Sequence, residues 1–336
     1  MEASSVRVFV ARRIPEEFLE PLRAHAEVEV WPEADVPPPP DVLRAKAQDA
    51  DGLITLLTDR VDRNLLAAAP RLRVVANLAV GYNNVDVAAA CERGVVVTYT
   101  PDVLTEATAD LVFLLVLGAA RRVREAIALV EENRWRGWAP FADLGVDLAG
   151  KTLGIWGMGR IGTAVARRAR GFGMEVVYHN RRPREDSAVR ELGARYVSFP
   201  ELLALSDVLV VLVPYAPELR HRIGAEEVHA MKRGAILVVA SRGGIVDEAA
   251  VAEALATGHL FAAGFDVYEV EPLPADSPLR RAPRVLLLPH IGSATEETRA
   301  AMARLAVDNV VRVLRGLSPR TPVPECADFA ENSFRP

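Results

Sequence analysis

The sequence predicts an α/β protein with two domains, each a parallel sheet flanked by helices. Short β-branched runs alternate with helical stretches along most of the chain, as in parallel sheets joined by crossover helices. The length of 336 residues corresponds to roughly two domains of about 150 residues. A glycine motif between a strand and a helix, described below, is the third indication.

The N-terminal series is read from buried, apolar runs bounded by turn residues. The expected strands are Val6–Val10, Val28–Trp31, Gly52–Leu57, Val74–Leu78 and Val95–Tyr99. The expected helices between them are Pro15–His25, Asp41–Asp49, Arg63–Ala69 and Asp86–Arg93. One long helix, Val103–Asn133, should follow with Asp102 as its N-cap. Its first half is apolar nearly all round, which predicts burial between layers or subunits.

A second α/β series begins at Lys151. Its expected strands are Thr152–Trp156, Glu175–His179, Val208–Val213, Ala235–Ala240, Ala262–Asp266 and Val285–Leu288. A final helix is expected over Thr295–Arg315, followed by a tail that contains proline. The second series therefore repeats the strand and helix alternation of the first.

Composition and charge exclude several classes of protein. Hydrophobic residues make up 50% and the net charge is −5, which argues against disorder and against nucleic acid or an anionic membrane as the main partner. The two cysteines, Cys91 and Cys326, cannot form a disulfide framework or a cysteine metal cluster, so we expect reduced thiols and no metal site. No signal-peptide pattern is visible, and Leu111–Ala120 is too short to span a bilayer. We expect a cytoplasmic protein.

The motif Gly157-Met158-Gly159-Arg160-Ile161-Gly162 matches G-x-G-x-x-G. A match alone is weak, but an apolar strand precedes this one and a helix, Thr163–Arg170, follows it. In a dinucleotide site the first glycine allows a tight turn, the second lets the backbone approach the pyrophosphate, and the third lets helix and strand pack closely. The helix N-terminus offers N–H groups to the phosphates.

The end of the next strand bears on the choice of cofactor. An NAD site normally has Asp or Glu there to hold the ribose hydroxyls, but this sequence has Asn180 followed by Arg181 and Arg182. Without a carboxylate a 2′-phosphate is not repelled, and guanidinium groups match its geometry. NADPH is therefore favoured over NADH, although the same pair would also fit as two solvated arginines.

Three charged residues follow expected strands of the second series: Arg242, Glu271 and His290. In open α/β sheets the carboxyl ends of the strands form the face that binds ligands. A single histidine after an apolar run is more often structural. An arginine, a glutamate and a histidine that all follow strand ends beside a dinucleotide motif form a far more specific combination.

Ordered motifs along nearly the whole chain resemble the D-2-hydroxyacid dehydrogenase family and, within it, the glyoxylate/hydroxypyruvate reductases. Besides the glycine loop, the resemblance is carried by Val8–Pro15, Leu56–Asp59, Ala79–Tyr82, Tyr99–Thr105, Ser241–Gly243, Asp266–Pro274 and Leu288–Thr295. It implies two Rossmann-like domains, namely a discontinuous, flavodoxin-like substrate domain at 1–101 and 295–336 and an NAD(P)-binding domain at 102–294. It also implies a homodimer.

The resemblance assigns roles to individual residues. It implies that His290 donates a proton to the substrate oxygen, that Glu271 orients His290 and favours its protonated form, and that Arg242 binds the substrate carboxylate. The N–H groups of Val80 and Gly81 should bind the same carboxylate. Further cofactor contacts are implied at Thr108, Arg160, Ile161, Pro214, Ala240, Ser241, Asp266 and Gly292.

Two positions are ambiguous. Trp138 resembles an aromatic residue that reaches a neighbouring subunit's substrate site, but a core or dimer-contact tryptophan would look the same. Leu219 stands where relatives often have threonine, so one cofactor hydrogen bond is expected to be missing.

The implied activity is reduction of glyoxylate or hydroxypyruvate by NADPH or NADH. Dehydrogenases of the phosphoglycerate or phosphite type share the same scaffold and remain alternatives. A dinucleotide-sensing protein that resembles a transcriptional corepressor is an alternative of another class, because such proteins can keep the Arg/Glu/His set.

Overall fold

The computed structural model describes residues 5–327, which form two compact units. One unit runs to Leu104 and resumes at Thr295, and the other is Thr105–Ala294. The predicted substrate domain extends to residue 336, so its last residues, 328–336, lie outside the described chain.

The first unit is built on a parallel sheet with the strand order β2-β1-β3-β4-β5. Its strands are β1 (Arg7–Val10), β2 (Glu27–Val30), β3 (Gly52–Thr55), β4 (Val74–Asn77) and β5 (Val96–Thr98). Every residue of β3, β4 and β5 is buried, as expected for strands covered on both faces. The order confirms the flavodoxin-like topology predicted for this region.

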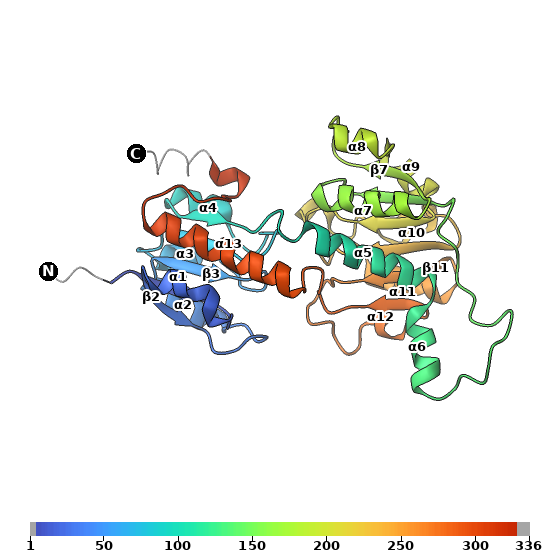
Figure 1. The fold of residues 1–336 in the computed structure, drawn as a ribbon, viewed down its shortest axis with the longest axis horizontal. Helices are drawn as coiled ribbons and strands as arrows, with labels where there is room; N and C mark the ends of the chain where they lie inside the picture. Colours follow the sequence, from blue (N-terminus) through green and yellow to red (C-terminus); the bar gives the residue numbers. More distant parts are fainter. Residues whose placement is uncertain (1–4, 328–336) are drawn as a thin grey trace. The chain divides into compact units, whose positions relative to one another are not determined.

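The helices of the first unit are α1 (Glu16–Arg23), α2 (Pro40–Gln48), α3 (Arg63–Ala68), α4 (Val87–Glu92) and α13 (Glu296–Leu314), with a short 3-10 turn η2 (Pro324–Cys326). Helix α13 comes from the far end of the sequence yet packs against α1, β3 and β4 (Figure 1). Gly52 allows this approach, because a Cβ there would lie 3.2 Å from Val310 Cγ1. Thr295 caps the helix by accepting a hydrogen bond from the Thr298 N–H.

The second unit contains a longer parallel sheet with the order β12-β11-β10-β9-β6-β7-β8. Its strands are β6 (Thr152–Trp156), β7 (Glu175–His179), β8 (Arg195–Tyr196), β9 (Val208–Val211), β10 (Ala235–Val239), β11 (Leu260–Phe265) and β12 (Val285–Leu287). From β8 to β11 this is the order of a dinucleotide-binding fold, with the switch point between β6 and β9. The predicted Rossmann-like fold is confirmed.

Helices cover the sheet of the second unit, with an apolar core on each face. They are α5 (Thr105–Ala120), α6 (Val123–Glu131), α7 (Arg160–Gly171), α8 (Ser187–Glu191), α9 (Phe199–Leu205), α10 (Ala225–Ala230), α11 (Glu248–Ala256) and α12 (Pro278–Arg281), with the 3-10 turn η1 (Pro217–Leu219). Helix α5 packs on β10, β11 and α7 (Figure 1), which explains its nearly uniform apolar surface.

The prediction of one long helix over Val103–Asn133 was wrong. The chain forms α5 and α6 instead, and the break falls at Arg122, which adopts a left-handed conformation with φ 53°. The Val146 N–H donates to the Ala120 carbonyl at 2.9 Å, so a later segment uses an oxygen that the helix would need to continue. Asp102 is not the N-cap either, because α5 begins only at Thr105.

Of the predicted strands, all are present with ends shifted by up to two residues, and the short strand β8 was missed. Among the described residues, no helix is both long and apolar enough to cross a membrane.

Candidate active site

The glycine loop joins β6 to α7, and the structure distinguishes the three glycines. Gly157 has φ 107°, and a Cβ there would lie 2.6 Å from the Val213 nitrogen. A Cβ on Gly162 would lie 2.5 Å from the Gly157 oxygen. Around Gly159, by contrast, a Cβ would meet nothing within 4 Å. The first and third glycines are therefore required by the fold, whereas the second borders open space.

Helix α7 follows this loop directly. The helix begins at Arg160, with Gly159 as its N-cap and Ile161 in its first turn. The first N–H groups of a helix have no acceptor within the helix and carry its positive dipole end. A pyrophosphate beside Gly159 would therefore meet donors without a side chain in the way.

Asn180 follows β7 and holds the glycine loop. Its Oδ1 accepts from the Met158 N–H at 2.7 Å and its Nδ2 donates to the Met158 carbonyl at 3.3 Å. Sequence reasoning missed Arg184, whose guanidinium donates to the same carbonyl at 3.1 Å and pairs with Asp186 at 2.6 Å. No motif singles it out, because its contact depends on how the loop after β7 folds back.

Arg181 and Arg182, the next two residues, are exposed. Within the described chain, neither makes a hydrogen bond or an ion pair. Their guanidinium groups therefore donate no hydrogen bond to an acceptor among the described residues, whereas the guanidinium of Arg184 does.

Ala240, Ser241 and Arg242 follow the end of β10. The Arg242 guanidinium donates to the Ser241 carbonyl at 2.8 Å. Burial lowers the pKa of Arg242 and the charge of Glu271 raises it, but an arginine remains cationic at neutral pH. The Ser241 hydroxyl is buried and has no hydrogen-bond partner among the described residues. A buried hydroxyl without a partner fits a site that a bound group completes.

His290 and Glu271 are in direct contact. Nδ1 of His290 lies 2.7 Å from Oε2 of Glu271, and Oε1 of Glu271 accepts from the Tyr268 N–H at 3.0 Å. About a quarter of each side chain is exposed, 25% for the histidine and 23% for the glutamate. With Nδ1 engaged, Nε2 is the ring nitrogen left for a substrate.

Electrostatics keep Glu271 ionised. Burial alone would raise the pKa of this carboxyl, but the hydrogen bond and charge of His290, the Tyr268 N–H and the charge of Arg242 together lower it. A carboxylate bound to the second nitrogen of a histidine orients the ring and stabilises its protonated form, as general acid catalysis requires.

Asp266, at the end of β11, shapes the loop that carries His290. Its two carboxylate oxygens accept from the Ile291 and Gly292 N–H groups, each at 2.8 Å. Burial raises the pKa of Asp266, against the effect of these hydrogen bonds. Gly292 is also close to α5, since a Cβ there would lie 3.4 Å from Thr108 Cγ2. The structure thus brings Asp266, Gly292 and Thr108 together beside His290.

The remaining predicted residues lie on other segments of the second unit or in the first unit. Pro214 is exposed after β9, and Leu219 is half-buried against the core. Trp138 follows α6 and is 84% exposed. Val80 and Gly81 lie in the first unit after β4, and their N–H groups have no hydrogen-bond acceptor among the described residues. That these donors bind a carboxylate stays a prediction.

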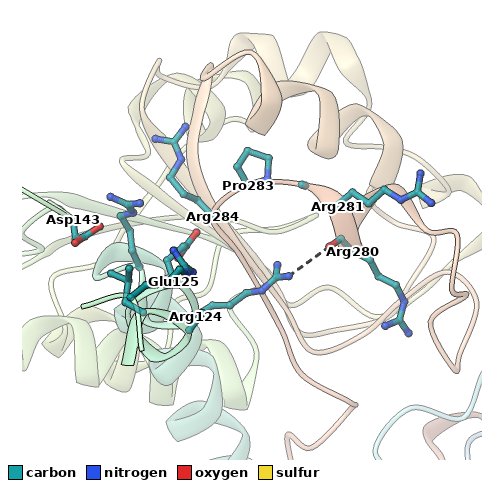
Figure 2. A pocket seen from close by; sticks show the side chains of 12 residues that line it. Arg124, Glu125, Asp143, Arg280, Arg281, Pro283 and Arg284 are labelled. Atoms are coloured by element: carbon teal, nitrogen blue, oxygen red, sulfur yellow. Dashed lines mark hydrogen bonds between the residues drawn. The ribbon is translucent and has the colours of Figure 1, made fainter. Parts of the chain in front are cut away.

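A hollow of about 370 Å³ elsewhere in the second unit contains none of the predicted site residues (Figure 2). Much of its lining is arginine: Arg122, Arg124, Arg134, Arg280, Arg281 and Arg284. Arg124 donates to the Arg280 carbonyl at 3.5 Å and to the Val285 carbonyl at 3.1 Å. These bonds connect α6 to α12 and to the first residue of β12, so this arginine has a structural role.

Comparison with known proteins gives consistent results. The family model described as D-isomer specific 2-hydroxyacid dehydrogenase, NAD binding domain, matches residues 113–292. A glyoxylate reductase of Korarchaeum cryptofilum is 48% identical over 93% of this chain and 94% of its own length.

Solved structures match over nearly the full length of both chains. A glyoxylate reductase from Paecilomyes thermophila has a TM-score of 0.86 at 35% identity, covering 96% of this chain and 99% of that one. An NADPH-dependent glyoxylate/hydroxypyruvate reductase from Sinorhizobium meliloti, in complex with NADP and malonate, has a TM-score of 0.84 at 36% identity, covering 99% of each chain.

Proposed function

Because the chain belongs to the D-isomer specific 2-hydroxyacid dehydrogenase family, we propose that it reduces glyoxylate, and the related 2-oxoacid hydroxypyruvate, with a nicotinamide dinucleotide. The observation that carries the proposal is the 2.7 Å contact between His290, which follows β12, and Glu271, which follows β11; Arg242 follows the neighbouring strand β10. The curated relative and both solved structures described above are named for reduction of glyoxylate.

The residues divide the chemistry between them. The cofactor supplies the hydride that the substrate's carbonyl carbon accepts. His290 holds the proton at Nε2 and gives it to the carbonyl oxygen, while Glu271 keeps the ring in place through Nδ1. Arg242 binds the substrate carboxylate through its planar fork and draws electron density toward the carbonyl oxygen.

The cofactor fits the second unit on two observations. The space at Gly159 is open beside the N-terminus of α7, and the buried Ser241 hydroxyl lacks a partner among the described residues. The pyrophosphate would lie on the glycine loop, and the nicotinamide end toward Ser241 and Asp266.

Gly159→Ala should weaken NADPH binding about tenfold or more, roughly 1.4 kcal/mol, without lowering the Tm. The new methyl group meets nothing within 4 Å in the protein, so it interferes only with a bound pyrophosphate. The Kd from a fluorescence titration and the Tm of the free protein measure the two effects.

Gly162→Ala is the matched control. Its methyl group would lie 2.5 Å from the Gly157 oxygen, so it should lower the Tm of the free protein. An unchanged Kd for NADPH in Gly159→Ala would place the pyrophosphate elsewhere.

The preference for NADPH over NADH is supported by the uncommitted, exposed Arg181 and Arg182 and by the absence of a carboxylate at Asn180. One charge-assisted hydrogen bond to the 2′-phosphate contributes about 1.5–3 kcal/mol when well formed. We therefore expect at least about a tenfold higher kcat/KM with NADPH than with NADH.

Asn180→Asp combined with Arg181→Ala should reverse that preference, because the carboxylate binds the ribose hydroxyls and a phosphate partner is lost. Arg181→Ala alone is the control and should reduce the preference without inverting it. Both cofactors are compared at one low ionic strength, since salt screens exposed phosphate contacts. Equal kcat/KM values in the parent would show that the arginines do not bind the phosphate.

A homodimer is supported by the exposed apolar side chains on α6 and the segment after it. Val130 is 66% exposed, Trp135 64%, Trp138 84% and Phe141 86%. Exposed apolar side chains gathered on one segment are typical of a protein–protein interface. The molar mass in solution tests the oligomeric state.

A substrate panel tests the activity itself. The loss of NADPH absorbance is followed on adding glyoxylate, hydroxypyruvate or larger 2-oxoacids, each also with NADH. Oxidation of 3-phosphoglycerate or phosphite is measured in parallel. Turnover of glyoxylate supports the proposal. Turnover of phosphoglycerate or phosphite alone would replace it, and dinucleotide binding without any turnover would favour a sensor.

A further inference from the structure

The two cysteines meet in the first unit although 235 residues separate them in sequence. Cys91 lies on α4 and Cys326 on η2, and their sulfur atoms are 2.7 Å apart as free thiols. A disulfide bond is about 2.0 Å long, so little movement would be needed to form one. The sequence contains no other cysteine, so neither has a competing partner within the chain.

The backbone around Cys326 fixes this proximity independently of the sulfurs. The Val323 N–H donates to the Val97 carbonyl of β5 at 2.9 Å, and the Cys326 N–H donates to Val323 at 2.9 Å. Upstream, Thr321 exchanges hydrogen bonds with Tyr99, accepting from its N–H at 3.1 Å and donating from its hydroxyl at 2.7 Å. The C-terminal segment, residues 321–326, is therefore fastened along β5 and brings Cys326 onto α4.

The same segment supports the loop after β4. The Tyr82 hydroxyl donates to the Glu325 carboxylate at 3.1 Å, and the Tyr82 ring makes an edge contact with Tyr99 at a centroid distance of 5.6 Å. Tyr82 directly follows Val80 and Gly81. A disulfide bond at Cys326 would therefore also hold its neighbour Glu325, which accepts the hydrogen bond from Tyr82.

We propose that Cys91 and Cys326 form an intramolecular disulfide that fastens the C-terminal segment to α4. The oxidant is a low-molecular-weight disulfide such as oxidised glutathione. The Cys91 thiolate attacks one of its sulfurs and releases one reduced thiol. The Cys326 sulfur then attacks the Cys91 sulfur and releases the second, its proton passing to the departing thiolate. Two protein thiols are oxidised and one small disulfide is reduced to two thiols.

The order of attack follows from burial. Cys91 is partly exposed and can meet the oxidant, whereas Cys326 is fully buried. Burial, together with the contact with Cys91, raises the pKa of Cys326 to about 12. Cys326 is therefore a poor first nucleophile, but it lies in place to resolve a mixed disulfide on Cys91.

The experiment uses the full chain, purified reduced and divided between dithiothreitol and oxidised glutathione. Each sample is denatured in an alkylating reagent, digested and examined by mass spectrometry. The oxidised sample should yield one peptide pair that joins Cys91 to Cys326, and dithiothreitol should abolish it. Its Tm should exceed that of the reduced sample by about 5 °C or more, because the bond closes a very long loop.

Cys91→Ser and Cys326→Ala are the matched controls, and in each the Tm should be the same with either reagent. Glutathione retained on Cys91 with Cys326 free, two alkylated cysteines in the oxidised sample, or a linked pair without a rise in Tm would each overturn the proposal. None of these measurements depends on catalysis, so their outcome is separate from that of the proposed activity.

Discussion

His290→Ala should lower kcat for glyoxylate by about 10²-fold or more, the usual contribution of a general acid. The variant loses the ring whose Nδ1 is held by Glu271 at 2.7 Å, and with it the proton at Nε2. The Kd for NADPH should remain close to that of the parent, because the proposed pyrophosphate site lies on the glycine loop. Steady-state kinetics and a cofactor titration on the same preparation measure both quantities.

Glu271→Gln is the informative companion to this variant. The amide can keep a hydrogen bond to the ring but removes the negative charge beside it, so activity should fall, though by less than in His290→Ala. In the parent, the pKa of Glu271 lies below its usual range, so the carboxylate is lost only as the pH falls through that lowered value.

Near-native turnover in His290→Ala would remove His290 from the mechanism.

Arg242→Lys should raise KM for glyoxylate and lower kcat, reducing kcat/KM by about 10²-fold. Lysine keeps the positive charge but loses the planar fork that binds a carboxylate through two parallel hydrogen bonds. A less exact hold on the carboxylate displaces the carbonyl from His290, so binding and turnover should suffer together.

Arg233→Lys, at an exposed site in the same unit, is the control for the loss of an arginine and should leave both constants unchanged. If Arg242→Lys kept the KM and the activity of the parent, Arg242 would be a structural arginine and the substrate carboxylate would bind elsewhere.

Sequence reasoning succeeded where local pattern and burial coincide. Strands such as β3 and β9 are buried at every position, so their apolar runs identify them without knowledge of the fold. The glycine motif could be recognised for a similar reason. There is no room for a Cβ at Gly157 or Gly162, so the local backbone requires glycine at both positions. The structure places Arg242, Glu271 and His290 after β10, β11 and β12, as expected from the alternation of strands and helices, while their roles stay predictions.

Features that depend on contacts between distant parts of the chain could not be predicted from the sequence. The break between α5 and α6 arises where Val146 takes the Ala120 carbonyl, a contact that the helical pattern of 103–133 does not contain. Arg184 reaches the glycine loop only because the chain folds back after β7. The meeting of Cys91 and Cys326 likewise depends on the course of the C-terminal segment along β5.

At Asn180 the sequence gives the residue type but not the contacts of the side chain. The sequence has an asparagine, and therefore no carboxylate, at the end of this strand. The structure adds that its amide binds both the N–H and the carbonyl of Met158. A substitution there therefore acts on the glycine loop as well as on the charge near the ribose, which is why Arg181→Ala alone is needed as a control.

Transfer of deuterium tests the central claim most directly. NADPH that carries deuterium at both hydrogen positions of the nicotinamide C4 is incubated with the protein and glyoxylate, and the product is examined by NMR and mass spectrometry. We expect glycolate with one deuterium on C2 for each NADPH oxidised, and a rate at least about 10²-fold lower with His290→Ala. Oxidation of NADPH without labelled glycolate, or no oxidation at all, would contradict it.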